Sequence, residues 1–236
     1  MPKKSSNELS GLRVCHVFGG VRALKIGGWQ KDHGAKVFQL MIEDPKPYEG
    51  YWRNKIDIVA HDFATSLYNK LKSKQVFSVF KAYLFLYFFY VKRLADVVRK
   101  NDVQVIHAHR HTGAAVAFLA KKLFGLRAKI IFDYHDPWSA EEKPDKGLLL
   151  KAALKNYFWL ENYLVKNADL VVTQGEEQTN ILVNRHKISG KKFVFTWNTA
   201  DPKLYEPNPA SRAILRKKYG IGGKHAVLYL GTVINY

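Results

Sequence analysis

The sequence alternates between short apolar runs with the character of strands and longer stretches with the character of helices. The strand-like runs lie at 12–18, 35–42, 56–60, 103–109, 128–135, 168–174 and 192–197. Most are continuously apolar, as expected where helices cover both faces of a parallel sheet. Helix-like stretches separate them, chiefly at 76–99, 114–125 and 148–166 and again from Glu176. This repeated alternation predicts an α/β fold, a Rossmann-like doubly wound parallel sheet with helices on both faces.

The composition is that of a folded chain with a large positive charge. Hydrophobic residues make up 47% of the 236 residues and aromatic residues 14%, which excludes global disorder. The formal net charge of +18 favours an anionic partner, which could be nucleic acid, anionic lipid or a phosphorylated substrate. The single Cys15 excludes an internal disulfide, and its apolar neighbours mark it as a buried strand residue.

The N-terminus and the apolar segments bear on location. Residues 1–10 form a basic, polar leader without the continuous apolar stretch of a secretory signal. No segment reaches the roughly 20 apolar residues that a membrane-spanning helix needs. We therefore expect a cytoplasmic protein, attached at most peripherally to the cytoplasmic face of the membrane.

Polar residues follow several of the strand-like runs at the point where each run ends. They are Gly19-Gly20, the segment His107–His111, the segment Asp133–Trp138 and the segment Gln174–Glu177. Right-handed crossovers place the carboxyl ends of parallel strands at one edge of the sheet. These loops are therefore expected to gather along that edge and to form a site.

The glycine pair and the histidines each allow two interpretations. Gly19 and Gly20 form either a tight turn or a loop whose N–H groups approach a phosphate or a sugar hydroxyl. His107 and His109 are two residues apart in a strand, so they point to the same face; His107 is either a buried structural residue or part of a site. No metal is predicted, because no suitably spaced carboxylate or thiolate completes a ligand set.

The segment after the fifth strand-like run combines acids, a histidine and a tryptophan. Asp133 and Asp136 place two carboxylates around the imidazole of His135, which suits orientation of a base or binding of sugar hydroxyls. Trp138 could stack on a sugar ring. The alternative is a capped helix entry after Pro137. Glu176 and Glu177 are expected in the first turn of a helix, where its dipole favours acids.

The stretch at 76–99 predicts a long helix that is unusually aromatic. It is apolar on all sides around 82–91 and has basic residues on its flanks. Such a helix either lies in the core with a solvated basic face or meets an anionic membrane surface. The candidate membrane-facing residues are Tyr83, Phe85, Phe88, Phe89, Lys92 and Arg93.

The motifs together resemble the N-terminal, acceptor-side domain of GT-B glycosyltransferases, within the retaining family 4. The resemblance rests on His107-Ala-His109, on His135-Asp136, and on the segments ADLVVTQGEEQ, WNTAD and KYG. The chain departs from the family where it has Gln174-Gly175 in place of a serine and Asn-Thr-Ala-Asp in place of Asn-Gly-Val-Asp. The resemblance implies that His109 is catalytic, and we expect this strand-end residue to reach the cleft while His107 lies deeper. It also implies acceptor- or phosphate-binding roles for Gly19, Gly20, His107, Arg110, His135, Asp136 and Trp138.

The resemblance also implies a domain organisation. Residues 11–202 are predicted to form the glycosyltransferase domain, 203–224 the interdomain crossover, and 225–236 the first strand of a C-terminal donor domain that the chain lacks. No cofactor is expected in this chain, because the nucleotide-sugar donor would bind that other domain. The chain alone is then expected to be inactive unless a separate chain supplies the donor domain.

The implied activity is retaining transfer of a sugar from a nucleotide sugar to a lipid-linked or polysaccharide acceptor, at an anionic membrane surface. The alternative is a basic, non-enzymatic module that binds nucleic acid or membrane. Nucleic acid is disfavoured, because the aromatic residues concentrate in one apolar helix instead of alternating with Lys and Arg on a sheet face.

Overall fold

The computed structural model describes residues 8–41, 56–59, 76–135, 148–196 and 207–228. The chain divides into two compact units, Met1–Trp197 and Asn198–Tyr236. Residues 1–7 of the predicted leader, the domain boundary at 202 and most of the predicted strand at 225–236 lie outside the described residues.

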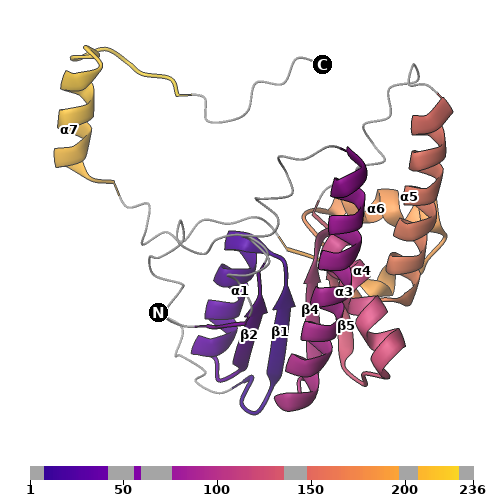
Figure 1. Ribbon diagram of the computed structural model, residues 1–236. Coiled ribbons are helices and arrows are strands. Elements are labelled where there is room, and N and C mark those ends of the chain that lie inside the picture. The colour runs from indigo at the N-terminus through magenta and orange to yellow at the C-terminus, as the bar shows by residue number, and fades with distance from the viewer. Residues whose placement is uncertain (1–7, 42–55, 60–75, 136–147, 197–206, 229–236) are drawn as a thin grey trace. The chain divides into compact units, whose positions relative to one another are not determined.

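The larger unit is built on one parallel sheet (Figure 1). Its seven strands follow the order β3-β2-β1-β4-β5-β6-β7, and every neighbouring pair is parallel. The strands are β1 (Arg13–Val17), β2 (Lys36–Leu40), β3 (Asp57–Val59), β4 (Val105–His109), β5 (Lys129–Asp133), β6 (Leu170–Thr173) and β7 (Phe193–Phe195). The predicted fold class is confirmed, and each strand lies inside the range expected from the sequence.

Helices pack on both faces of this sheet because side chains alternate along its strands. On one face, Cys15 and Val17 belong to a large core that Leu94 and Ala114 complete from two of the helices. On the other face, Val37 packs against Leu24. The helices are α1 (Gly20–Asp32), α3 (Val76–Lys100), α4 (Arg110–Phe124), α5 (Leu148–Asn167) and α6 (Glu176–His186), followed by the short 3₁₀ helix η4 (Gly190–Lys192).

The smaller unit contains the helix α7 (Pro209–Lys218). The side chain of Asn208 caps it by accepting a hydrogen bond of 2.9 Å from the backbone N–H of Ser211. Val227 and Leu228, which belong to the predicted strand at 225–236, are exposed and have no regular secondary structure. A strand needs a neighbour to accept its backbone hydrogen bonds, and the described residues show none for this segment.

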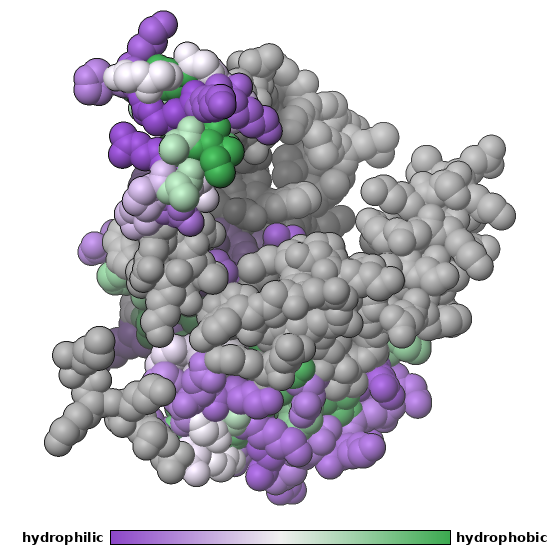
Figure 2. Space-filling view, turned by 90° about the vertical axis from the view of Figure 1, so that its left-hand side faces the viewer, coloured by the Kyte–Doolittle hydropathy of each residue, from purple (hydrophilic) through white to green (hydrophobic). Residues whose placement is uncertain are grey.

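The helices of the described residues do not include one that is long and apolar enough to cross a membrane. Where these residues reach the surface in Figure 2, most are hydrophilic, as expected from the high proportion of Lys and Arg.

Candidate functional site

A polar cluster lies where the chain reverses the direction in which it adds strands. β1 and β4 are neighbours in the sheet, but the chain goes from β1 to β2 on one side and from β4 to β5 on the other. Such a switch point opens a crevice at the carboxyl ends of the strands, where α/β proteins commonly bind ligands. His16 of β1 and His107 of β4 are paired residues across this point.

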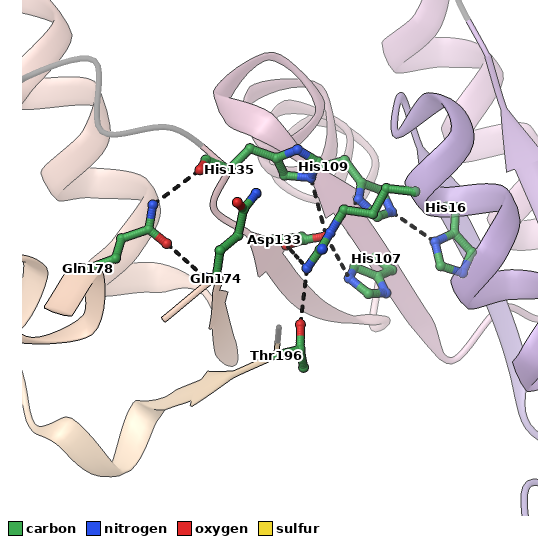
Figure 3. Close-up of polar contacts among 9 residues, drawn as sticks. His16, His107, His109, Asp133, His135, Gln174, Gln178 and Thr196 are labelled. Carbon is green, nitrogen blue, oxygen red and sulfur yellow. Dashed lines mark hydrogen bonds and ion pairs between the residues drawn. The ribbon is translucent and has the colours of Figure 1, made fainter. Parts of the chain in front are cut away.

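Hydrogen bonds link side chains from both sides of the switch point (Figure 3). Nε2 of His16 lies 2.8 Å from Oε1 of Gln30 on α1, and Nδ1 of His16 lies 2.9 Å from Nε2 of His109. On its other side, Nδ1 of His109 lies 2.9 Å from Oδ2 of Asp133, at the end of β5. A continuous polar chain therefore crosses the sheet from α1 to β5.

Asp133 is the centre of the cluster. Arg22 of α1 donates to both of its oxygens, at 2.7 Å and 3.2 Å, and also donates at 3.0 Å to Oγ1 of Thr196. Nε2 of His135 lies 3.3 Å from Oδ2 of Asp133, and Nε2 of His107 lies 3.9 Å from it. One carboxylate thus meets a guanidinium and several imidazoles, which is the charge balance that a buried acid requires.

Burial sets the protonation states of the cluster. Burial lowers the pKa of His16 and His107 to about 3 and that of His109 to about 4, so all three imidazoles are neutral near pH 7. Burial alone would raise the pKa of Asp133, but the contacts with His109, His135 and Arg22 hold that pKa well below its usual range. The carboxylate is therefore ionised and the imidazoles are uncharged.

The glycine loop is shaped around this cluster. A Cβ atom on Gly19 would lie 2.5 Å from the ring of His109 and 2.4 Å from Cβ of Ala23. Phe18 and Arg110, which directly follow β1 and β4, have φ angles of 64° and 58°. Non-glycine residues in this left-handed region are uncommon and concentrate at functional sites.

The structure brings together part of the predicted site. His107, His109 and His135 meet around Asp133, and the rings of His107 and His109 stack with centroids 4.5 Å apart, as expected for residues on one strand face. Arg110 is exposed at the start of α4. Gly20 begins α1 with a φ of 51°. Asp136 and Trp138 lie outside the described residues.

One expectation about the geometry needs correction. We expected the strand-end residue His109 to reach the cleft and His107 to lie deeper, but His109 is 0% exposed and His107 is 5% exposed. Gly19 lies against the ring of His109 at the end of the strand, so chain position did not determine exposure. Of the two carboxylates expected around His135, Asp133 lies 3.3 Å from its Nε2, and Asp136 lies outside the described residues.

The sequence did not single out several members of the cluster. His16 interrupts an apolar strand run, and a polar residue in such a position often has a buried partner. Arg22 follows the glycine pair by two residues, within the first turn of α1. Gln30 and Thr196 carry no signal of this kind, because their partners are distant in sequence.

A second buried network lies in the larger core, on the face of the sheet that α5 and α6 cover. Glu161 of α5 accepts hydrogen bonds from Tyr134 at 2.7 Å and from His186 of α6 at 2.8 Å. Burial raises the pKa of Glu161, but contacts with His111, His186 and Tyr134 lower it to about 2. This network ties α5 and α6 to the end of β5.

The predicted membrane-facing residues of α3 differ in exposure. Phe88 is 60% exposed, whereas Phe89 packs against the core. Lys92 and Arg93 are exposed, and Lys92 lies 3.5 Å from Asp96. The side chains of Tyr83 and Phe85 lie outside the described residues. Large apolar side chains are also exposed on the neighbouring helices, at Leu119, Leu123 and Trp159.

Sequence comparison assigns the chain to a class of enzymes. Residues 52–204 match the model of Glycosyltransferase Family 4, and the chain belongs to this family. No curated protein matches the sequence.

Solved structures agree with this assignment in fold. A glycosyltransferase from Rickettsia africae matches with 17% identity and a TM-score of 0.58 over 90% of this chain and 50% of its own. HepE from Anabaena, in complex with UDP-glucose, matches with 14% identity and a TM-score of 0.59 over the same shares. Sucrose-phosphate synthase from Thermosynechococcus elongatus matches with 14% identity and a TM-score of 0.58, over 87% of this chain and 52% of its own. The chain thus spans about half the length of these structures, as expected for the N-terminal domain of a GT-B fold.

Proposed function

We propose that the chain is the acceptor-binding domain of a retaining glycosyltransferase, which transfers a sugar from a nucleotide sugar to a lipid-linked or polysaccharide acceptor. The observation that supports this most directly is the polar cluster around Asp133, at the switch point of a Family 4 sheet. The family also favours an enzyme over the alternative of a non-enzymatic basic module.

The chemistry of the cluster suits a sugar or phosphate ligand. The imidazole of His135 can exchange hydrogen bonds with hydroxyl groups, because its ring nitrogens can donate or accept. Arg22 and Arg110 add positive charge at the carboxyl edge of the sheet, where a diphosphate could be stabilised. We include Gly19, Gly20, His107, Asp136 and Trp138 in the proposed binding region on the basis of the sequence motifs.

The nucleotide-sugar donor would bind a domain outside the region that this chain shares with the solved structures. HepE was solved with UDP-glucose, and this chain covers 50% of it. We propose that the 236-residue chain alone has no transferase activity and that a donor domain, in the same or a separate chain, completes it. Its own residues would supply no cofactor site.

The exposed surfaces of α3, α4 and α5 would hold the enzyme at the cytoplasmic face of the membrane. Phe88, Leu119, Leu123 and Trp159 expose large apolar side chains on α3, α4 and α5. The exposed cations Lys92, Arg93, Lys122 and Lys166 lie on the same helices. Apolar and cationic side chains together favour an anionic lipid surface, where a lipid-linked acceptor would be found.

A transfer assay tests the proposed function. The chain, fused to the C-terminal domain of a close Family 4 relative, is incubated with labelled nucleotide sugars and a lipid extract from the host membrane. We expect labelled glycolipid with the anomeric configuration of the donor retained. His135→Gln should reduce turnover, whereas His33→Gln, which changes a histidine stacked on Trp29 away from the cluster, should not. Transfer unaffected by His135→Gln, or turnover by the 236-residue chain alone, would contradict the proposal.

A further inference from the structure

We infer that Gln30 and His16 are positioning residues of a one-way hydrogen-bond relay, in which Gln30 donates to His16, His16 donates to His109, and His109 donates to Asp133. The relay goes beyond the proposed transferase function and does not depend on it. Its consequence for catalysis does rest on that function.

The distances define the chain of contacts. Gln30 Oε1 and His16 Nε2 are 2.8 Å apart, and His16 Nδ1 and His109 Nε2 are 2.9 Å apart. His109 Nδ1 is 2.9 Å from Asp133 Oδ2, a contact short in distance but bent away from ideal hydrogen-bond geometry. His16, His109 and Asp133 are each 0% exposed, so water does not reach the contacts among these three side chains.

Counting protons determines the direction. A neutral imidazole has one N–H and one lone pair, and an ionised carboxylate only accepts. If His109 donated to His16, the lone pair on its Nδ1 would face the Asp133 carboxylate at 2.9 Å in a buried site, and the two would repel each other. If His16 donates instead, Nδ1 of His109 carries the proton beside the carboxylate at 2.9 Å, and the contact becomes attractive although it is bent.

The favourable direction of the relay determines the orientation of the Gln30 side-chain amide. Once Nδ1 of His16 carries the proton, its Nε2 is a lone pair and needs a donor. The Gln30 amide supplies one when its N–H₂ group takes the position assigned to Oε1, a half-turn that leaves all distances almost unchanged. An imidazolium would allow the opposite amide orientation, but burial of His16 and His109 disfavours the charge.

The relay leaves His109 with no free ring nitrogen. It donates through Nδ1 and accepts through Nε2, so we infer that it acts on a substrate through Asp133 and Arg22. A divalent cation would be the competing arrangement, either among His16, His107 and His109 or among His109, Asp133 and His135, since the ligand atoms of each group lie within 4.8 Å of one another. The first is disfavoured because His16 Nδ1 and His109 Nε2 already contact each other at 2.9 Å, and the second because Arg22 donates at 2.7 Å to Oδ2 of Asp133.

NMR of the imidazole rings tests the direction of the relay. Long-range ¹H–¹⁵N spectra at pH 7 distinguish a proton on Nδ1 from one on Nε2, and the signals are assigned from His16→Gln and His109→Gln. We expect Nδ1–H tautomers for both residues. His33 provides an internal reference, because its Nδ1 lies 2.8 Å from the carbonyl oxygen of Trp29, which only accepts. Protonation of Nε2 on either residue, an imidazolium, or a shift of these signals on adding Zn²⁺ would overturn the inference.

Two variants of Gln30 test its role. Gln30→Glu places an acceptor beside Nε2 of His16, so we expect the His16–His109 pair to gain a proton or reverse direction, seen as loss of the Nδ1–H pattern. Gln30→Met, of similar size but without hydrogen-bonding groups, should retain the pattern. Backbone amide spectra check that both variants fold. An unchanged pattern in folded Gln30→Glu would show that residue 30 does not hydrogen-bond to His16 and is not a positioning residue. In the fused transferase, Gln30→Glu should lower kcat more than Gln30→Met does. If the two variants had equal kcat although Gln30→Glu altered the tautomer pattern, the relay would stand and only its role in catalysis would be refuted.

Discussion

At the scale of single residues, the side chains at the switch point are held together by the buried carboxylate of Asp133. Replacing Asp133 with Asn leaves Arg22 without its anion and places an amide against His109. Removing one partner of a buried ion pair costs about 3–5 kcal/mol, so Asp133→Asn should lower the free energy of unfolding by about that amount. Urea denaturation at pH 7 measures it.

Asp169→Asn is the matched control for this substitution. Its carboxylate is partly exposed and pairs with Lys129 at 2.8 Å, away from the cluster. We expect a loss of only about 1 kcal/mol there, since partly exposed ion pairs contribute little. Similar losses in the free energy of unfolding for the two variants would show that the buried contacts of Asp133 do not stabilise the larger unit more than a surface ion pair does.

Three buried histidines should make the fold sensitive to acid. The pKa of His16 and His107 is lowered from 6.5 to about 3 and that of His109 to about 4, so the unfolded chain binds more protons below pH 6.5. Stability should therefore be full above pH 6.5 and fall as the pH drops from there towards 4. Each histidine contributes a slope of about 1.4 kcal/mol per pH unit in that window.

Urea denaturation at several pH values between 7 and 4.5 measures this slope. His107→Gln should reduce it, because one of the histidines that resists protonation is gone. His33→Gln lies outside the cluster and should leave the slope unchanged. A free energy of unfolding that stays constant from pH 7 to 5 would contradict the buried neutral imidazoles.

The sequence predicted part of the site at this scale. His109 and His135 could be identified because each ends an apolar run, and His107 because it is two residues before His109 on the same strand. Gln30 could not be identified. The partner of His16 could not be predicted either, because His16 faces His107 only once the β1–β4 register is known. The exposure of His109 depended on Gly19, whose missing side chain gives the ring its space.

Among the elements, one glycine fixes how closely α4 lies to β1. A Cβ on Gly113 would sit 2.7 Å from the backbone carbonyl oxygen of Val17, which cannot move without shifting the strand. Gly113→Ala should therefore cost about 1–3 kcal/mol, despite the better helix propensity of alanine. Thermal or urea unfolding measures the loss.

Gly190→Ala serves as the comparison, because a Cβ there meets nothing within 4 Å. We expect a change within about 0.5 kcal/mol. If Gly113→Ala were as harmless as Gly190→Ala, the close approach of α4 to β1 would be wrong.

The elements themselves were largely predictable from the sequence. Continuous apolar runs such as 128–135 and 168–174 gave β5 and β6 because a parallel sheet covered on both faces excludes polar side chains from its strands. The strand order was not predicted, since it depends on which runs pair across long stretches of chain.

For the molecule as a whole, the net charge of +18 leaves the nature of the anionic partner open, and the distribution of side chains favours a membrane. The exposed apolar groups on α3, α4 and α5 include the aliphatic Leu119 and Leu123, which can insert into a bilayer, whereas a nucleic-acid site would use aromatic rings to stack on bases. Binding to a bilayer should therefore combine an electrostatic part with an apolar part. Only the electrostatic part is screened by salt.

Co-sedimentation with anionic vesicles tests this surface. Lys92→Glu/Arg93→Glu should weaken binding at low salt, because each cation near such a surface contributes about 1 kcal/mol. Lys31→Glu/Lys36→Glu makes the same change in charge at exposed positions of α1 and β2 and should weaken it less. Trp159→Ser, which removes a side chain that is 69% exposed, should reduce the fraction that stays bound at high salt. Equal losses in the two charge variants would assign the binding to net charge alone, and no sedimentation of the unaltered chain at low salt would rule out a membrane role for the exposed surfaces of α3, α4 and α5.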